Sequence, residues 1–268
     1  EMCIRDSFTT VERHGLLGEG GIETSFAGFD NYIAALANQN FVASIGRMIL
    51  FGVVQVSVMI VAATILALLL ESAAAKWPGF FRSAYFLPYG IPGVIATILW
   101  SFLYIPGLSP IVDALQLVGI EADFLSPDMV LWSIANIVTW TYTGYNMLII
   151  IAQLKAIPGE LYEAARIDGA GPLKIVTSIQ LPLIRPALLL TIIFSIIGTL
   201  QLFAEPRLLM TMSSGITNEY TPNMSAYAYA FQHNEVGMAA AQAVIIAVSA
   251  FVLSAIALGV SSWAERKR

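Results

Sequence analysis

The sequence predicts an all-α membrane protein, a polytopic bundle of helices that cross the bilayer. Only 12% of its 268 residues are charged and 57% are hydrophobic, whereas a soluble domain carries about 25% charged and about 45–50% apolar residues. The charge is missing because five long runs contain no Asp, Glu, Lys or Arg. These runs are Met48–Leu70, Ser83–Val112, Met129–Leu154, Pro186–Ala204 and Val236–Ala264.

Each run meets or approaches the length of a membrane span. A helix of about 20 apolar residues crosses the hydrocarbon core, because each residue adds about 1.5 Å and the core is about 30 Å thick. Buried helices of a soluble protein are the alternative, but those normally carry a polar stripe and are shorter. We therefore predict five spans. The second contains Pro88, Gly90, Pro92 and Gly93 near its start, so we expect a kink there.

Composition excludes several classes of function. The single cysteine, Cys3, excludes an intrachain disulfide and a cysteine-based metal site. His14 and His233 lie far apart and lack metal-ligand spacing. Lys and Arg form no cluster other than the final Glu265–Arg268, which argues against nucleic-acid binding. We expect no bound metal, no cofactor and no catalytic residues in this chain.

Lys and Arg are distributed unevenly among the segments between the runs. Nine of the thirteen fall in Glu71–Arg82, 155–185 and the tail 265–268, which alternation places on one side of the membrane. The positive-inside rule makes that side cytoplasmic and residues 1–41 extracytoplasmic. Because the first 40 residues contain no apolar signal segment, we expect a further span before this chain, six in all, with residues 42–264 belonging to the transmembrane domain.

The segment 155–185 is predicted to contain a short amphipathic helix outside the bilayer. Pro158 favours a helix start, acidic residues follow in the first turns, and Gly169 favours a helix end. Ala164 and Ala165 give this helix a flat face, which suits insertion into a groove on another protein. A plain helical connector is the alternative, and it would need no particular residue pattern.

The pattern in this segment is particular. Glu163-Ala164-Ala165, Gly169 and the stretch Ile179-Gln180-Leu181-Pro182 resemble, residue by residue and in spacing, the EAA signature of permease subunits of ATP-binding-cassette importers. The resemblance implies the type I importer permease fold and a coupling helix that docks on an ATP-hydrolysing subunit. Glu163 would be its polar contact, the alanines would allow close approach, and Gly169 would permit a sharp turn. The implied coupling residues are Glu163, Ala164, Ala165, Asp168 and Gly169.

Three stretches are similar to the carbohydrate-uptake branch of that family. They are Tyr162–Gly171, Phe86-Leu87-Pro88-Tyr89 with Pro92, and Gln201-Leu202-Phe203-Ala204-Glu205-Pro206. They imply import of a sugar, either an oligosaccharide or a related polyol. The absence of Lys and Arg from the five runs argues mildly for a neutral cargo. Glycerol phosphate, an amino acid or a polyamine remain alternative cargoes. An ion-coupled secondary transporter is a further alternative, but it would predict acids within the spans and internal repeats.

The third and fourth runs carry polar residues that suit a passage for a sugar. By the same resemblance, the substrate pathway is expected at Tyr89, Gly93, Thr141, Tyr145, Gly198 and Gln201. The competing interpretation is that polar groups in spans hydrogen-bond across helices for packing and that aromatic residues lie at the membrane interface. Glu205 and Arg207 flank the outer end of the fourth run, where they face either a binding protein or solvent.

The resemblance also implies a set of partners. We expect two ATPase subunits that bind the ATP, a second permease subunit that is a distinct chain, an extracytoplasmic solute-binding protein, the sugar and the surrounding lipid. The implied location is the plasma (inner) membrane of a bacterium or archaeon, with several spans and a cytoplasmic C-terminus. This chain would rearrange its spans and carry out no covalent chemistry.

Overall fold

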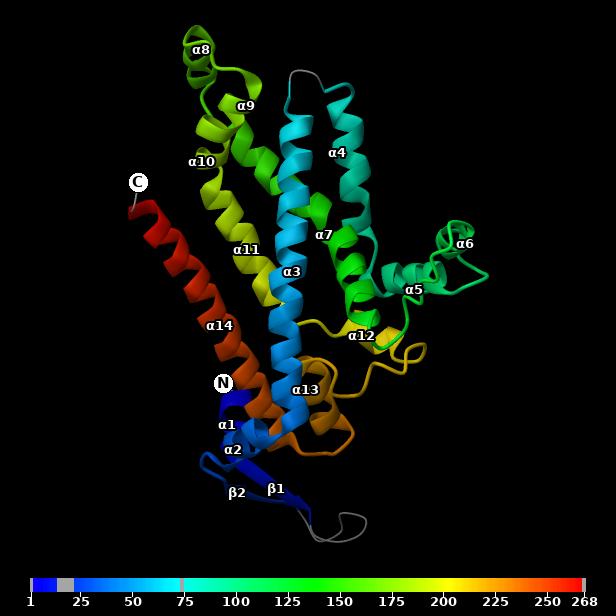
Figure 1. Cartoon of the computed structure of the whole chain (residues 1–268). Helices are drawn as coiled ribbons and strands as arrows, with labels where there is room; N and C mark the ends of the chain where they lie inside the picture. The colour runs from blue at the N-terminus through cyan, green and yellow to red at the C-terminus, as the bar shows by residue number, and fades with distance from the viewer. Residues whose placement is uncertain (1, 14–21, 73–74, 267–268) are drawn as a thin grey trace.

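The computed structural model describes residues 2–13, 22–72 and 75–266. His14, one of the two histidines considered above as metal ligands, lies outside the described residues. Four long helices dominate the fold (Figure 1). They are α3 (Gln39–Leu70), α7 (Val130–Lys155), α11 (Arg185–Leu200) and α14 (Val236–Arg266). Helix α3 packs against α7 and α11, and α14 packs against α11.

Shorter elements surround the four long helices. Near the N-terminus, an antiparallel hairpin pairs Thr9 with Phe26 and Arg13 with Ile22. The remaining elements are α1 (Met2–Asp6), β1 (Thr9–Arg13), β2 (Ile22–Phe26), α2 (Asp30–Ala37), α4 (Pro78–Phe86), η1 (Leu87–Gly90), α5 (Gly93–Tyr104), α6 (Pro110–Leu117), α8 (Gly159–Ile167), α9 (Pro172–Ile175), η2 (Val176–Gln180), α10 (Leu181–Leu183), α12 (Ala204–Leu209) and α13 (Pro222–Phe231).

The structure confirms the predicted kink and shows that it is a break. Helix α4 runs directly into η1, which ends at Gly90, and α5 begins at Gly93. The segment Pro78–Gly90 and the segment Gly93–Tyr104 are bent by 97° relative to each other. Pro92 immediately precedes α5, and proline lacks the N–H that a continuous helix needs. The run Ser83–Val112 therefore does not form the single helix that its length predicts. Helices α4 and α5 together make a bent pair.

Four of the five runs correspond to candidate membrane spans, and the run in α7 does not reach the same mean hydropathy. Among the described residues, three helices are long and apolar enough to cross a membrane, and the bent pair α4–α5 makes a fourth candidate. The three are Gln39–Leu70, Arg185–Leu209 and Val236–Val260. The second of them comprises α11 and α12. Helix α7 has the length of a span, but the polar residues along it lower its mean hydropathy. It occupies the interior of the bundle against α3, α4 and α11.

Three apolar clusters hold the long helices together, and the smallest joins Val56, Met59 and Ile60 of α3 to α11. The other two are larger. One lies near the start of α3 and contains Phe41, Met48 and Phe51 of α3 with Ile134 of α7. The other lies near the end of α3, where the small residues Ala63 and Ala67 face α7. Small residues allow two helix backbones to approach closely. The buried positions of α3 recur every three or four residues, as expected of one helix face.

The segments rich in Lys and Arg gather at one end of the molecule. Figure 1 shows α8, the start of α4 and the C-terminal end of α14 toward the same end, with β1, β2, α2 and α13 at the other. Arg82 donates a hydrogen bond to Glu71 at this first end and forms an ion pair with it. The alternation inferred from the sequence thus agrees with the chain's path.

The crossing of α4 over α7 depends on one glycine. A Cβ atom built on Gly144 would overlap the carbonyl oxygen of Tyr85. We predict that Gly144→Ala lowers the thermal unfolding midpoint in detergent, measured by tryptophan fluorescence, at a cost of roughly 1–3 kcal/mol for overpacking. Gly46→Ala is the control, because a Cβ there meets nothing within 4 Å. It should stabilise α3 by about 0.5–1 kcal/mol. Equal midpoints for the two variants would contradict this packing.

Candidate functional site

A cavity of about 500 Å³ lies at the centre of the bundle. Helices α3, α7, α11 and α12 form its walls, and the first residue of α5 closes one side. Its polar groups come from all four helices. The lining residues are Phe51, Gln55, Met59, Gly93, Val138, Tyr142, Tyr145, Asn146, Phe194, Ser195, Gly198, Thr199, Gln201, Leu202, Phe203, Ala204 and Glu205.

Aromatic rings form one wall of this cavity. Tyr89 of η1 stacks on Tyr145 of α7, with ring centroids 4.6 Å apart and planes 16° apart. Tyr142 meets the edge of Tyr89 at 5.8 Å. The packing of α4 and η1 along α7 brings Tyr89 here. Stacked phenol rings present both an apolar face and hydroxyl groups.

Buried amides also contribute to the lining of the cavity. Gln55 donates from Nε2 to Thr139 Oγ1 (3.3 Å) and to Met59 Sδ (3.5 Å). Asn146 donates from Nδ2 to the Tyr142 carbonyl oxygen (3.0 Å). These bonds use the NH₂ groups and orient the two amides. Their carbonyl oxygens keep the capacity to accept hydrogen bonds from a ligand.

The structure brings together most of the residues predicted for the pathway. Gly93, Tyr145, Gly198 and Gln201 line the cavity, and Tyr89 stacks directly behind Tyr145. A Cβ on Gly198 would meet nothing within 4 Å, so this position opens onto free space.

Thr141 does not join the other predicted pathway residues. Its side chain is buried, and its hydroxyl donates to the carbonyl oxygen of Ile137 one turn earlier (2.9 Å). Thr141 is absent from the cavity wall. This geometry fits the other interpretation of polar residues in spans, in which they serve helix packing and do not contact a substrate.

Two cavity residues escaped the sequence reasoning. Gln55 is the only amide in the run Met48–Leu70, and that was the available signal. Glu205 was expected at the outer end of the fourth run, facing a binding protein or solvent. Instead it lines the cavity, because α12 continues the span Arg185–Leu209 after a turn at Gln201. Its Oε1 lies 3.7 Å from the position of a Cβ on Gly93.

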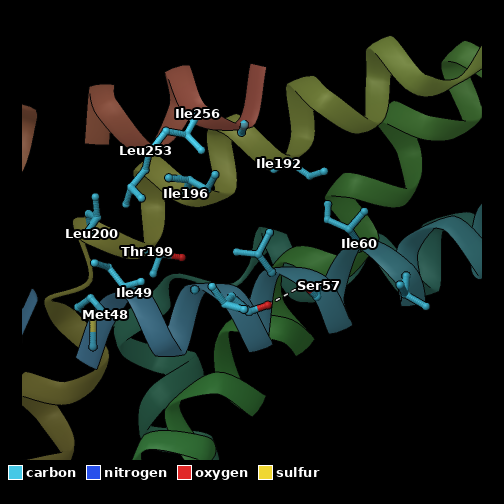
Figure 2. A pocket seen from close by; sticks show the side chains of 15 residues that line it. Met48, Ile49, Ser57, Ile60, Ile192, Ile196, Thr199, Leu200, Leu253 and Ile256 are labelled. Carbon is cyan, nitrogen blue, oxygen red and sulfur yellow. Dashed lines mark hydrogen bonds between the residues drawn. The ribbon is translucent and has the colours of Figure 1, made fainter. Parts of the chain in front are cut away.

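A second groove is unsuited to a polar ligand. It has a volume of about 490 Å³ and lies between α3, α11 and α14, with aliphatic side chains such as Ile60, Ile192 and Leu253 directed into it (Figure 2). Its hydroxyls are already bonded within their own helices. Ser57 donates to Val53 O at 2.6 Å, and Thr199 donates to Ser195 O at 2.9 Å. A sugar would find few hydrogen-bonding groups there.

The predicted coupling helix α8 stands clear of the bundle, and Figure 1 shows it at the extreme end of the molecule. None of its residues is buried. It ends at Ile167 with Asp168 as its C-cap, and Gly169 follows with φ +76°, a left-handed conformation that suits glycine. The Ala170 N–H closes the end by donating to Ala165 O at 2.8 Å.

The five residues implied for coupling lie together on this projection. Glu163, Ala164, Asp168 and Gly169 are exposed, and Ala165 is half-buried. The sequence reasoning did not single out two apolar side chains beside them. Ile167 is 86% exposed and Leu173 of α9 is 77% exposed.

The base of the loop is attached to the spanning helices. Ile157 is buried in the cluster that contains Ala67 of α3, Leu154 of α7 and Ile184 just before α11. Tyr162 packs against the same cluster and accepts a hydrogen bond from Gln180 Nε2 at 3.4 Å. A force applied to α8 therefore reaches three long helices through contacts at their ends.

No group of three or more His, Cys, Asp or Glu that could hold a metal ion occurs in the part of the chain that the structure describes.

Comparison with known proteins agrees with this architecture. Residues 32–266 match the family described as the inner membrane component of binding-protein-dependent transport systems. The chain belongs to this family, and it is therefore the membrane permease subunit of such a transport system.

Three relatives illustrate the likeness. The lactose transport system permease protein LacF of Rhizobium radiobacter is 32% identical over 216 residues, which are 78% of this chain and 71% of LacF. The sn-glycerol-3-phosphate transport system permease protein UgpA of Agrobacterium fabrum is 28% identical over 242 residues, 88% of this chain and 80% of UgpA. A bacterial importer of the acidic polysaccharide alginate contains a chain of the same fold, with a TM-score of 0.77, 22% identity, and coverage of 88% of this chain and 83% of that one.

Thiol labelling can establish which of the predicted pathway residues faces water. In a Cys3→Ser background, we predict that Gly198→Cys reacts readily with a membrane-impermeant methanethiosulfonate reagent, because this position opens into the cavity. Thr141→Cys should be protected, because its side chain is buried between helices. Labelling rates are measured on reconstituted protein. Faster labelling at position 141 than at 198 would show that the cavity has been assigned to the wrong face of α7.

Proposed function

We propose that this chain is the permease subunit of an ATP-driven importer that carries a sugar, either an oligosaccharide or a related polyol. The observation that carries the proposal is the central cavity, whose lining combines aromatic rings with buried amides. Stacked rings suit the C–H face of a sugar, and the amide oxygens of Gln55 and Asn146 suit its hydroxyls. A lactose permease among the relatives supports this cargo.

The proposed pathway consists of Tyr89, Gly93, Tyr145, Gly198 and Gln201. Gln201 lies where α11 ends, and its carbonyl oxygen accepts from Asn223 Nδ2 at 3.0 Å. Its side chain remains exposed to the cavity. Thr141 would act on the pathway only through the packing of α7.

We propose that α8 docks into a groove on an ATPase subunit. Support comes from its exposure, from the left-handed turn at Gly169 and from its attachment to the ends of α3, α7 and α11. Ile167 and Leu173 would supply apolar contacts, and Glu163 a polar one. This chain would bind no ATP itself, and its role would be mechanical.

The proposed orientation places α8 and the C-terminus in the cytoplasm of a bacterial or archaeal cell, with the chain in the plasma (inner) membrane. Nine of the thirteen basic residues fall in segments assigned to that side, and those segments share one end of the fold (Figure 1). The proposed partners are two ATPase subunits, a second and distinct permease chain, and an extracytoplasmic solute-binding protein.

The cargo assignment can be tested through the solute-binding protein of the same importer. Ligands stabilise the folded state of such a protein by mass action, so a thermal-shift screen identifies its cargo. We expect neutral oligosaccharides to raise its melting temperature. The complete importer, reconstituted in proteoliposomes, should then take up the same sugar when ATP is supplied. A binding protein that responds only to amino acids or polyamines would overturn the cargo.

Coupling can be tested at the projecting helix. We predict that Glu163→Lys combined with Gly169→Val abolishes ATPase-subunit binding or transport while the permease still folds. The first change reverses a charge at the docking face, and valine at φ +76° costs roughly 1–2 kcal/mol or more. Binding is measured by co-purification and transport by uptake.

Glu121→Lys is the matched control for that experiment. It makes the same change of charge at an exposed site far from α8 in the chain, and it should leave ATPase-subunit binding intact. Full transport by the double variant would remove the coupling proposal.

The exposed apolar residue on α8 gives a separate prediction. We expect Ile167→Asp to weaken ATPase-subunit binding by about 1–3 kcal/mol, because interface energy concentrates in a few residues that become buried on docking. Thermal stability of the isolated permease should not change, because Ile167 is 86% exposed there. Titration of the labelled permease with purified ATPase subunit measures the affinity. An unchanged dissociation constant would place Ile167 outside the interface.

A further inference from the structure

The central cavity contains a carboxylate that the transport function does not explain. Glu205 lies within the span Arg185–Leu209 and lines the cavity. It is the only Asp or Glu within the candidate spans of the described residues. Acidic residues within a span are costly, so an acid there that faces a cavity points to a role in passage.

Glu205 has no counter-ion in the described part of the chain. No hydrogen bond or ion pair joins its carboxylate to another side chain there. The basic residue two positions later points elsewhere, since Arg207 donates to Asn218 Oδ1 (3.1 Å) and lies 5.7 Å from the centre of the Tyr227 ring.

Two of the other basic residues within the candidate spans, Arg47 and Arg82, are also engaged. Arg47 donates to the Tyr220 carbonyl oxygen (2.6 Å) and lies 4.4 Å from the centre of that residue's ring. Arg82 is paired with Glu71. The field of Glu205 in the cavity is therefore not neutralised by either of these cations.

We propose that Glu205 selects the cargo by charge. Its carboxylate accepts hydrogen bonds from the hydroxyls of an uncharged sugar and repels phosphorylated or carboxylated molecules. The inference rests on the proposed function and narrows it to neutral or cationic cargo. A neutral or cationic cargo would distinguish this chain from the relative named for sn-glycerol 3-phosphate and from the structural neighbour named for the acidic polysaccharide alginate.

The geometry fits this role. Gly93 faces Glu205, and the absence of a side chain there leaves the carboxylate open to the cavity. Tyr142, Tyr145 and Asn146 line the same space, so a ligand that contacts the carboxylate also meets the aromatic wall and an amide. Low-dielectric walls strengthen the repulsion of an anion relative to water.

The electrostatic claim can be tested without knowing the cargo. Ser195 lines the same cavity, and Ser195→Cys in the Cys3→Ser background provides a thiol there. Two methanethiosulfonate reagents of similar size are compared, one with a trimethylammonium group and one with a sulfonate group. With Glu205 present, we expect the cation to react faster, and the ratio should fall toward one at high salt.

Substitution of Glu205 supplies the matched comparison. Glu205→Gln should lower the cation-to-anion rate ratio at position 195 by about tenfold, since a charged cleft concentrates counter-ions by about 10-fold or more. Glu205→Asp should retain most of the ratio. Thr177→Cys, exposed on the coupling segment, controls for reagent reactivity and should show no change. A ratio that is unaltered by Glu205→Gln, or one that favours the anion while Glu205 is present, would overturn the proposal.

Transport distinguishes failure of this inference from failure of the proposed function. The complete importer is assayed with lactose and with sn-glycerol 3-phosphate as probes. Uptake of a neutral sugar but not of the phosphate is expected. Efficient uptake of the phosphate would refute selection by charge and leave the importer assignment standing. If the importer takes up no sugar and no phosphate, the proposed cargo is refuted. The ratio of thiol-labelling rates would in that case still report the electric field of Glu205.

Discussion

The fold depends on one constraint, which is that polar groups within the hydrocarbon core must find partners inside the protein. Helix α7 carries most of these groups and sits among α3, α4, α5 and α11. Asn136 donates to the hydroxyl of Tyr104 on α5 (3.0 Å), and Thr139 receives a bond from Gln55 on α3. These bonds hold neighbouring helices against α7, and the same arrangement surrounds the central cavity with polar groups.

Much of the architecture could be predicted from the sequence, because uncharged runs of span length leave few alternatives in water. The basic residues predicted which ends of the helices share a side, and the motif at Glu163 predicted the projecting helix. The break at Pro92 was expected as a kink, but the 97° angle depends on how α5 packs against α12, which no local pattern encodes. Likewise, the polar stretch of α7 did not by itself show that this helix is internal. Its position follows from its contacts with α3, α4 and α11.

The cavity was predicted less completely than the fold. Gly93, Tyr145, Gly198 and Gln201, which the family resemblance grouped, line the same cavity. Thr141 does not, because one residue on a helix changes the facing direction by about 100°, and short motifs do not determine helix rotation. Glu205 was misplaced because a charged residue next to an apolar run normally marks the end of a span. Here α12 continues beyond it.

The bent pair α4–α5 borders the cavity with two halves that are anchored separately. Helix α4 is locked against α7 where Tyr85 meets Gly144, whereas α5 packs against α12, which carries Glu205. Helix α5 is also held against α7 at its C-terminal end, where the Tyr104 hydroxyl donates to Ser133 O and accepts from Asn136. A change in the angle between α4 and α5 therefore falls on the backbone torsions of Ile91 and Pro92, the residues of the break, and it leaves the Gly144 crossing in place.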